Sequence, residues 1–325
     1  MLVLSAEDVT KCLPMKAAIA GMHHAYAACT NGDADMPQRT VMQLGATSNL
    51  AIFMPVHIKG FSELALKSVT FSPNNEQLKL PVIQAIVQVF DASTGTPVAL
   101  IDGRQLTAIR TAAGGGASVE LLAREESRSL AMLGSGVQAR AGIEAACCAR
   151  EIEVVRLFSP TKGNAQRLAG LLSEKEWCPD IQVVENPDDA VSDADIVWTA
   201  TTATSPTFSR ESVKAGAHIV GIGSFQPSMV EIDPALLGSA SIFIDDTEAC
   251  WAEAGEVIAA RDDGLIQVAD VTELGEVVLG RHPGRSSQNE LTVFKSVGVA
   301  CQDAVASSSV LEAAQRLGLG TTVDI

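Results

Sequence analysis

The most informative stretch of the chain reads Arg128-Ser-Leu-Ala-Met-Leu-Gly134-Ser-Gly136-Val-Gln-Ala139. Its apolar start predicts a buried strand, and the turn that follows fits the pattern G-x-G-x-x-A and opens a helix predicted over 137–150. In that pattern the first glycine makes a tight turn, the second lets backbone N–H groups approach a pyrophosphate, and the alanine lets helix and strand pack closely. The helix N-terminus attracts the phosphates. The stretch predicts a dinucleotide site; the alternative is an ordinary tight turn between a strand and a helix.

The sequence after this turn alternates between short apolar strands and helical or polar connections. Further strands are expected at 154–158, 181–184, 195–199, 218–222 and 241–245. Such alternation is typical of a parallel, doubly wound sheet. Residues 117–299 are therefore expected to form a Rossmann-type α/β domain.

The sequence before the turn has a different rhythm. Short β-branched stretches predict an antiparallel sheet, and two longer stretches predict helices at 6–30 and 106–124. The expected strands are 51–58, 63–70, 82–90 and 96–101. A last apolar helix, expected over 296–318, follows the final strand of the parallel sheet. We expect it to return to the first domain, so that 1–116 and 300–325 form one α+β domain.

Length, composition and charge narrow the range of functions. The 325 residues correspond to about two domains, and 47% hydrophobic with 19% charged residues is globular composition. The 23 basic and 39 acidic residues give a net charge of −16, which repels nucleic acid and anionic membranes. Neither a signal peptide nor a membrane-spanning stretch is recognisable. We expect a cytoplasmic protein that binds neither nucleic acid nor membrane.

Cysteine and histidine are not arranged as metal ligands. The seven cysteines form no C-x-x-C pair, and the five histidines form no H-E-x-x-H motif. We therefore expect reduced thiols and no metal site. Cys147-Cys148 is assigned to packing, and the acidic pair Asp245-Asp246 is assigned to a solvated strand end.

The tip of the second strand bears on the choice of dinucleotide. An NAD-preferring site has an acid there that binds the ribose 2′-hydroxyl, but this chain reads Phe158-Ser159-Pro160-Thr161-Lys162. Hydroxyls and a lysine favour a 2′-phosphate, so NADPH is the expected cofactor, with NADH possible. The alternative is that Ser159 and Thr161 only form a turn before the next helix.

Several separated motifs together resemble the ornithine cyclodeaminase and mu-crystallin family, in particular its ketimine reductases. They occur in family order over nearly the whole chain. They are Met36-Pro-Gln-Arg39, Ala65-Leu-Lys67-Ser-Val-Thr70, Leu80-Pro81, Leu106-Thr-Ala-Ile-Arg110-Thr-Ala-Ala113, Gly134-Ser-Gly-Val-Gln138-Ala139, Val220-Gly-Ile-Gly223-Ser and Phe294-Lys-Ser-Val-Gly298. The resemblance implies a homodimer, with a substrate-binding and dimerisation domain joined by the last helix and a dinucleotide-binding domain between.

The resemblance also implies roles for single residues. Arg39 and Arg110 hold a substrate carboxylate, and Lys67 lies beside the reacting carbon as the catalytic residue. Phe225, Val297 and Gly298 line the substrate. The implied cofactor-binding residues are Arg110, Gly134, Gly136, Val137, Gln138, Ser159, Thr161, Lys162, Thr199, Ala200, Thr201, Gly223, Ser224 and Ser296.

The chemistry of the implied substrate residues agrees with these roles. A guanidinium group grips a carboxylate through two parallel hydrogen bonds, which lysine does not offer. Near two such groups and partly desolvated, Lys67 is expected to have a pKa lowered towards neutrality, suited to moving a proton to or from a C=N or C=O bond. Surface salt bridges are the alternative for Arg39, Lys67 and Arg110.

One departure from the family redirects the function. Cyclodeaminases and the related alanine dehydrogenases resemble Gly-x-Asp-x-Pro-Gly-Lys where this chain reads Gly223-Ser-Phe225-Gln-Pro227-Ser-Met229. The catalytic aspartate of the pattern falls on Phe225, which cannot act as an acid or base. Phe225 is expected to form an apolar wall against ring methylenes; plain core packing is the alternative.

These observations favour NAD(P)H-dependent reduction of a cyclic imino acid. The expected reaction converts 1-pyrroline-2-carboxylate to L-proline, with the six-membered homologue to L-pipecolate as a further substrate. Two alternatives within the family are ornithine cyclodeaminase and alanine dehydrogenase. An alternative of another class is an NADPH-dependent protein that binds small ligands without turnover, like a crystallin.

Overall fold

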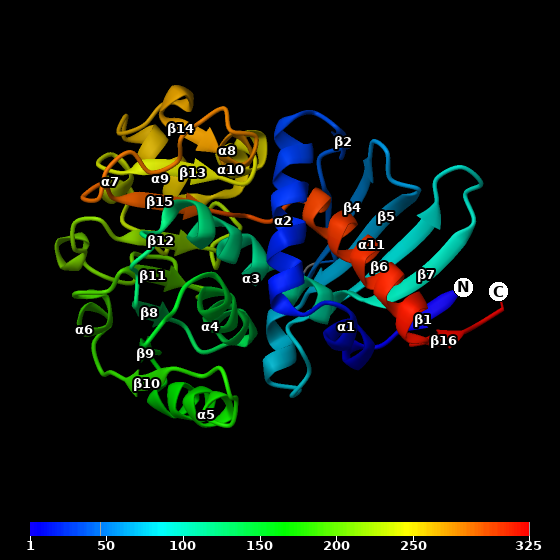
Figure 1. The fold of residues 1–325 in the computed structure, drawn as a ribbon, viewed down its shortest axis with the longest axis horizontal. Coiled ribbons are helices and arrows are strands. Elements are labelled where there is room, and N and C mark those ends of the chain that lie inside the picture. Colours follow the sequence, from blue (N-terminus) through cyan, green and yellow to red (C-terminus); the bar gives the residue numbers. More distant parts are fainter. Residues whose placement is uncertain (46, 325) are drawn as a thin grey trace. The chain divides into compact units, whose positions relative to one another are not determined.

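Helix α3 (Gly103–Leu122) carries the boundary between the two units of this computed structural model (Figure 1). One unit comprises Met1–Arg110 with Ala300–Ile325, and the other comprises Thr111–Val299. The structure describes residues 1–45 and 47–324; Ile325, the end of the expected first domain, lies outside them, as does Ala46. The division falls between Arg110 and Thr111, whereas the sequence placed it after Gly116. Both positions lie inside the same continuous helix.

The first unit contains one eight-stranded sheet. Its order is β16-β1-β7-β6-β5-β4-β2, with β3 paired to β4. The strands are β1 Leu2–Leu4, β2 Ala34–Asp35, β3 Thr40–Gln43, β4 Leu50–Ile58, β5 Glu63–Phe71, β6 Ile83–Asp91, β7 Pro97–Asp102 and β16 Thr321–Thr322. The four expected strands correspond to β4 to β7 and pair antiparallel, as predicted. The added strand β1 pairs parallel to β7, so the sheet is mixed.

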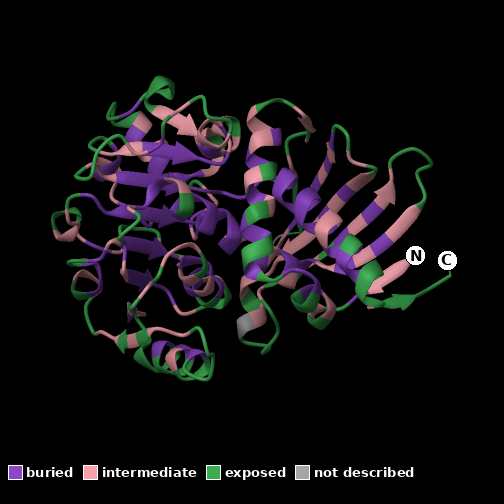
Figure 2. Ribbon diagram, in the orientation of Figure 1, coloured by how far each residue is buried: buried purple, intermediate pink, exposed green. Residues whose placement is uncertain are grey.

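Helices cover one face of this sheet. The predicted helix 6–30 is in fact two helices, α1 (Ala6–Cys12) and α2 (Met15–Thr30). Pro14 is the reason, because a residue without an N–H group fits the start of a helix and disrupts its interior. Helix α11 (Ala300–Leu317) packs against α2 and against β4 and β5, and most of its first twelve residues are buried (Figure 2).

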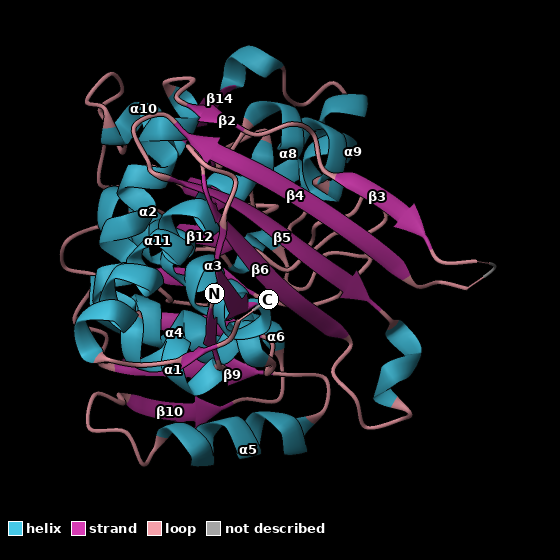
Figure 3. Ribbon diagram, turned by 90° about the vertical axis from the view of Figure 1, so that its right-hand side faces the viewer, coloured by secondary structure: helices cyan, strands magenta, loops and turns pink. Residues whose placement is uncertain are grey.

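The region around β3 and the start of β6 exposes apolar side chains. Strands β3, β4 and β5 lie at the front in Figure 3. All four residues of β3 are exposed, and so is the start of β6. Large apolar side chains in and beside these strands are between 39% and 66% exposed, which is unusual for so many neighbours in sequence. They are Val41, Met42, Leu44, Leu78, Leu80, Ile83 and Ile86.

The second unit contains an eight-stranded sheet in which every pair is parallel. Its order is β10-β9-β8-β11-β12-β15-β13-β14. The strands are β8 Ser129–Leu133, β9 Val154–Phe158, β10 Asp180–Val183, β11 Ile196–Thr199, β12 His218–Gly221, β13 Ser241–Ile244, β14 Val271–Glu273 and β15 Thr292–Lys295. The chain turns back across the sheet between β8 and β11, which is the switch point where Rossmann-type sheets bind dinucleotides. The predicted α/β class is confirmed.

The helices of this unit are short and connect successive strands. They are α4 Val137–Ala149, α5 Lys162–Leu172, α6 Pro187–Val191, α7 Pro234–Leu237, α8 Thr247–Glu253, α9 Gly255–Asp262 and α10 Leu274–Val278, with 3-10 helices at Pro73–Glu76 in the first unit and at Arg210–Ser212 and Val268–Asp270 here. Trp198 of β11 is fully buried against two glycines. A Cβ on Gly115 of α3 or Gly142 of α4 would lie 2.5 or 2.8 Å from its ring, so only glycine lets both helices approach.

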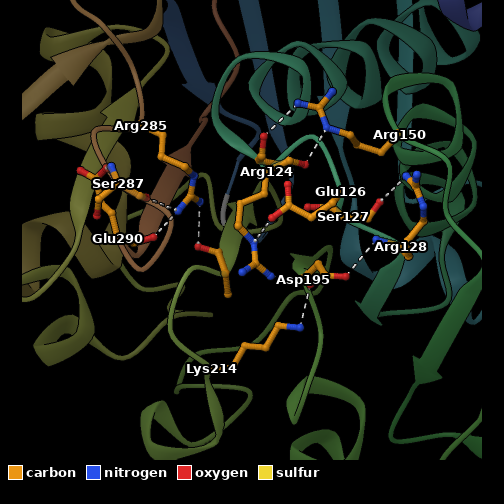
Figure 4. A network of polar contacts seen from close by, with 12 residues as sticks. Arg124, Glu126, Ser127, Arg128, Arg150, Asp195, Lys214, Arg285, Ser287 and Glu290 are labelled. Carbon is orange, nitrogen blue, oxygen red and sulfur yellow. Dashed lines mark hydrogen bonds and ion pairs between the residues drawn. The ribbon is translucent and has the colours of Figure 1, made fainter.

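A polar network closes the amino ends of β8 and β11 (Figure 4). Asp195 accepts hydrogen bonds from the backbone N–H groups of Arg128 and Ser129 at 2.9 and 3.0 Å, and it pairs with Arg124 and Lys214, each at 2.7 Å. Burial alone would raise the pKa of Asp195, but these donors outweigh it and lower the pKa well below its usual range. The network lies at the opposite end of these strands from the glycine turn.

Among the described residues, no helix is long and apolar enough to cross a membrane.

Candidate active site

Lys67 is buried in the middle of β5. Its neighbours across the sheet are Met54 on β4 and Val87 on β6, and cross-strand neighbours share one face. These three side chains are each less than 5% exposed. Because α11 packs on this sheet, the ammonium group of Lys67 is shielded from water.

The partner of Lys67 comes from α11, 236 positions along the chain. Asp303 accepts a hydrogen bond from Lys67 Nζ on Oδ2 at 2.7 Å and one from Arg110 Nε on Oδ1 at 3.0 Å. Arg110 Nη1 donates to Gln302 Oε1 at 2.8 Å, and Gln302 Nε2 donates to the hydroxyl of Tyr26 at 2.8 Å. Two consecutive residues of one helix therefore fix the guanidinium plane.

This pairing sets the protonation of both ends. Burial and the charge of Arg110 lower the pKa of Lys67 from 10.5 to about 7, although Asp303 opposes that shift. Burial alone would raise the pKa of Asp303, but Arg110 and Lys67 hold it below its usual range. Asp303 is thus a carboxylate at neutral pH, while Lys67 lies near the midpoint of its titration, as expected for a residue that transfers protons.

Arg39 lies near this group. It directly precedes β3, is half-buried, and is close enough that its charge also lowers the pKa of Lys67. The structure therefore brings Arg39, Lys67 and Arg110 together in the first unit. One detail differs from the expectation that both arginines are free to bind a carboxylate through two hydrogen bonds. The Nε and Nη1 groups of Arg110 already donate to Asp303 and Gln302.

In the second unit the glycine turn lies at the switch point of the sheet. Gly134 has φ +125°, a conformation that favours glycine, and a Cβ there would meet the carbonyl oxygen of Ala200 at 2.5 Å. Gly136 caps α4 without any side-chain hydrogen bond, and a Cβ on it would meet nothing within 4 Å. The N–H groups at the start of α4 are open to an anion.

The neighbouring side chains fit a dinucleotide as well. Gln138 Oε1 is buried and has no hydrogen-bond partner among the described residues, so it suits a ligand hydroxyl. Val137 is 68% exposed, which suits a valine that a ligand covers. Ser159 Oγ accepts a hydrogen bond from Ser135 Oγ at 2.9 Å, which ties the tip of β9 to the glycine turn.

The tip of β9 is less basic than the sequence suggested. Lys162 Nζ donates to Glu185 Oε1 at 2.5 Å, and both side chains are more than half exposed. Glu185 follows β10, which pairs with β9, so the sheet order brings it close to Lys162. An acid is therefore present beside the expected ribose site, and the charge of Lys162 is balanced by Glu185 and does not by itself favour NADPH.

Glu231 holds together the ends of β11 and β12. Its carboxylate accepts hydrogen bonds from the N–H groups of Thr201, Gly223 and Ser224 at 2.6, 2.7 and 2.9 Å, and from Thr201 Oγ1 at 2.9 Å. Burial raises the pKa of this carboxyl group. Three predicted cofactor residues are thus held by an acid that the sequence reading missed. Thr199 is fully buried inside the sheet, and its hydroxyl donates to the Val220 carbonyl.

Asp245 is not a solvated strand end, and that expectation is wrong. It is fully buried after β13 and accepts hydrogen bonds on Oδ2 from Ser296 Oγ at 2.7 Å and from the N–H groups of Val297 and Gly298 at 3.1 and 2.7 Å. It holds the segment in which the family places substrate and cofactor contacts. This arrangement also explains why α11 begins at Ala300 and not at 296.

A third buried group involves Ser224. Lys295 Nζ donates to both the carbonyl oxygen and Oγ of Ser224, each at 2.6 Å, and it pairs with Glu256 Oε1 at 3.2 Å. Ser224 Oγ in turn donates to Glu256 Oε2 at 2.6 Å. Both charged side chains are fully buried. The loop that carries Phe225 therefore starts from a rigid anchor.

Phe225 packs against the hydrophobic core of the second unit and remains partly exposed. Met229, at the position of the family's lysine, is 7% exposed. Neither position contributes a charge. Sequence reasoning missed Asp303, Glu231, Asp245, Glu256 and Lys295. One signal was available, since Asp303 is the single charged residue in the otherwise uncharged stretch 300–311.

Comparison with protein families agrees with this geometry. The model of the ornithine cyclodeaminase/mu-crystallin family matches residues 1–317. A delta(1)-pyrroline-2-carboxylate reductase of Bacillus cereus is 35% identical over 326 residues, and the match covers 100% of both chains.

Solved structures with the same fold include two with bound dinucleotide. The Thermococcus litoralis delta(1)-pyrroline-2-carboxylate reductase in complex with NADH and L-proline superposes with a TM-score of 0.95 at 33% identity, covering 99% of this chain and 100% of that one. An archaeal alanine dehydrogenase dimer with bound NAD superposes with a TM-score of 0.93 at 29% identity, covering 100% and 99%.

Proposed function

The chain belongs to the ornithine cyclodeaminase/mu-crystallin family, and we propose that it reduces 1-pyrroline-2-carboxylate to L-proline, with 1-piperideine-2-carboxylate to L-pipecolate as a second reaction. It is an NAD(P)H-dependent oxidoreductase that acts on CH–NH bonds. A cyclic imino acid offers a carboxylate and a C=N bond close together, and the buried groups of the first unit match these two features.

One observation carries the proposal: a buried lysine with a pKa of about 7 beside two arginines, in a chain that has phenylalanine where deaminating relatives have an acid. Reduction of C=N needs a hydride on carbon and one proton on nitrogen. It needs no residue that activates water. Deamination of ornithine must in addition move protons at the amino group that leaves as ammonia, which the aspartate of the family pattern can do and Phe225 cannot.

The proposed steps assign each residue one task. Arg39 and the Nη2 group of Arg110 bind the substrate carboxylate. The reduced nicotinamide, when bound, supplies hydride to the imine carbon. Lys67 donates a proton from Nζ to the imine nitrogen, becomes a neutral amine, and takes a proton back from solvent before the next turnover. Phe225, Val297 and Gly298 line the ring of the substrate.

The second unit supplies the dinucleotide site in this proposal. Gly134, Gly136 and Val137 bind the pyrophosphate at the start of α4, and the buried Gln138 Oε1 accepts a hydrogen bond from a ribose hydroxyl. The remaining cofactor residues lie at the carboxyl ends of the strands: Ser159, Thr161, Lys162, Thr199, Ala200, Thr201, Gly223, Ser224 and Ser296. Glu231 and Asp245 hold several of them in position.

Assays with three substrate sets test the reaction. Purified protein is given 1-pyrroline-2-carboxylate with NADPH or NADH, ornithine with NAD⁺, and pyruvate with ammonia and NADH. We expect turnover with the imino acid at least about tenfold faster, in kcat/KM, than with the others, because the latter two need an additional amine step. Turnover of ornithine alone would assign a cyclodeaminase. Turnover of none, with intact dinucleotide binding, would assign a binding protein.

The exposed apolar residues around β3 and the start of β6 support a homodimer as part of the proposal. Seven large apolar side chains in and around β3 and β6 face solvent in a single chain. A surface of this kind is typical of a protein contact. The archaeal alanine dehydrogenase that shares the fold is described as a dimer.

A further inference from the structure

We propose that Asp303 is a positioning residue for the proton-transfer step, which holds Lys67 Nζ and the Arg110 guanidinium through its two carboxylate oxygens and favours the protonated form of the lysine. The inference rests on the proposed function for the identity of the substrate. It adds to that function a residue that neither touches the substrate nor transfers a proton itself.

The geometry gives Asp303 two tasks with its two oxygens. Oδ2 accepts from Lys67 Nζ at 2.7 Å, and Oδ1 accepts from Arg110 Nε at 3.0 Å. A carboxylate is rigid and planar, so the two cations are held at a fixed separation. Lys67 and Arg110 come from β5 and α3, and the carboxylate on α11 bonds both. Asp303 therefore links Lys67, the proposed proton donor, to Arg110, which is proposed to bind the substrate carboxylate.

The charges around Lys67 explain why the negative charge of Asp303 is needed beside it. Arg110 from α3 and Arg39 before β3 lower the pKa of its ammonium group, and Asp303 from α11 raises it. Two positive charges and burial without a counter-charge would leave Lys67 neutral at pH 7. A neutral amine cannot donate the proton that reduction requires. Asp303 thus keeps a proton on Lys67 in a site that otherwise expels it.

A purely structural role is the competing explanation, because removal of one partner from a buried ion pair is destabilising by itself. The chain offers a matched control. Gln302 precedes Asp303 on the same helix, is equally buried, and bonds the same Arg110, but it carries no charge. Loss of Gln302 disturbs the guanidinium group without changing charge at the lysine.

The test compares Asp303→Asn, Asp303→Glu and Gln302→Met with the wild type by two measurements. The first is the pH profile of kcat for reduction of 1-pyrroline-2-carboxylate. The second is the titration of the Lys67 side chain by NMR of [13C]lysine-labelled protein, with Lys67→Met to assign the resonance. The NMR titration needs no substrate, so it tests the role of Asp303 even where the proposed reaction is wrong.

In Asp303→Asn we expect the pH at which kcat falls on the alkaline side of its profile (the alkaline limb) to decrease by roughly one to three units. The NMR titration of Lys67 should shift by the same amount. Asn keeps the shape and an acceptor for Arg110 but loses the charge. Asp303→Glu should restore the limb with a lowered kcat, because charge returns and geometry does not. Gln302→Met should raise KM and leave the limb in place.

Two results would overturn the proposal. One is an Asp303→Asn protein that melts at a lower temperature but titrates Lys67 at the wild-type pH. The other is an equal displacement of the limb in Gln302→Met. If Asp303→Asn does not fold, Asp303→Glu decides alone: an unchanged kcat would show that the position of the carboxylate is unimportant. If the wild-type protein titrates as described but does not reduce the imine, the proposed reaction is refuted, whereas the effect of Asp303 on Lys67 is not.

Discussion

The carboxylate of Asp245 lies 2.7 Å from the N–H of Gly298, and this contact joins the end of β13 to the turn after β15. The two strands are already neighbours in the parallel sheet, so the contact continues their pairing beyond the last backbone hydrogen bond. Gly298 has φ +79°, which bends the chain into the start of α11. Asp245 therefore determines the conformation of the segment that leads from one unit to the other.

Replacement of Asp245 by alanine should lower stability by about 2 to 4 kcal/mol, because Ser296 Oγ and two N–H groups lose a buried acceptor. Thermal unfolding measures this. NADH binding, followed by its fluorescence, should weaken about tenfold. Asp246→Ala is the control, since the Asp246 side chain caps α8 and its loss should cost about 1 kcal/mol. Equal losses for both variants would refute the special role of Asp245.

Lys67→Met should reduce kcat by at least about a thousandfold while the dissociation constant of the dinucleotide stays within about twofold of wild type. The side chain lies in the first unit, and the glycine turn lies in the second. Stopped-flow turnover and fluorescence titration check the two halves of this statement. Loss of dinucleotide affinity in the variant would assign Lys67 to the cofactor instead.

The cofactor preference depends on the pair Lys162 and Glu185 and on Ser159. Glu185→Gln should lower the KM for NADPH by about threefold to fivefold, because it frees a cation and removes an acid from the ribose end. Ser159→Asp should do the opposite and raise the KM for NADPH more than that for NADH. Steady-state kinetics with both dinucleotides measures the ratio. If neither variant changes it, the 2′-phosphate does not reach this strand tip.

Stability should fall in acid through His218. This side chain is buried between Ser118 and Thr292, and burial, with a contribution from Arg285, lowers its pKa from 6.5 to about 3. Between these values the unfolded chain binds a proton and the folded chain does not, so stability is lost as pH falls below 6.5. Between pH 7 and 4.5 the loss is about 2.5 kcal/mol. His218→Gln should remove this part of the pH dependence in urea unfolding, and an unchanged pH dependence in this variant would contradict the prediction.

A charge among the exposed apolar residues around β3 and the start of β6 should disrupt the proposed dimer. Ile86→Glu, at a position 42% exposed in the single chain, should shift sedimentation towards the monomer by at least about a hundredfold in dissociation constant. Leu317→Glu, at the exposed end of α11, is the control and should leave the dimer intact. A monomeric wild type, or an Ile86→Glu protein that sediments unchanged, would contradict the prediction.

The parts of the fold that the sequence predicted are those with strong local signals. The glycine turn, the alternating strands of 51–102 and the switch to strand and helix after Glu125 follow from hydrophobic period and turn residues. The predicted helix 6–30 was wrong because Pro14 was given too little weight. Strand β15 was missed because Thr292–Lys295 is short and its partners β12 and β13 are distant in sequence.

The candidate site divides in the same way. Arg39, Lys67 and Arg110 were identified because they lie in motifs that resemble those of the family. Asp303, Glu231 and Asp245 were not, because a buried carboxylate is recognisable only by the donors that surround it. Those donors are the N–H groups and cations of other segments of the chain. Burial of an acid is a tertiary property, which composition and spacing do not contain.

The glycine contacts of Trp198 have a practical consequence. All three tryptophans, Trp177, Trp198 and Trp251, lie in the second unit, and the single tyrosine, Tyr26, lies in the first. Trp198 is completely enclosed, so its emission will be blue-shifted while α3 and α4 stay in contact with it and will move to the red when they separate. Near-ultraviolet spectroscopy can therefore follow the melting of each half of the chain separately, without any label.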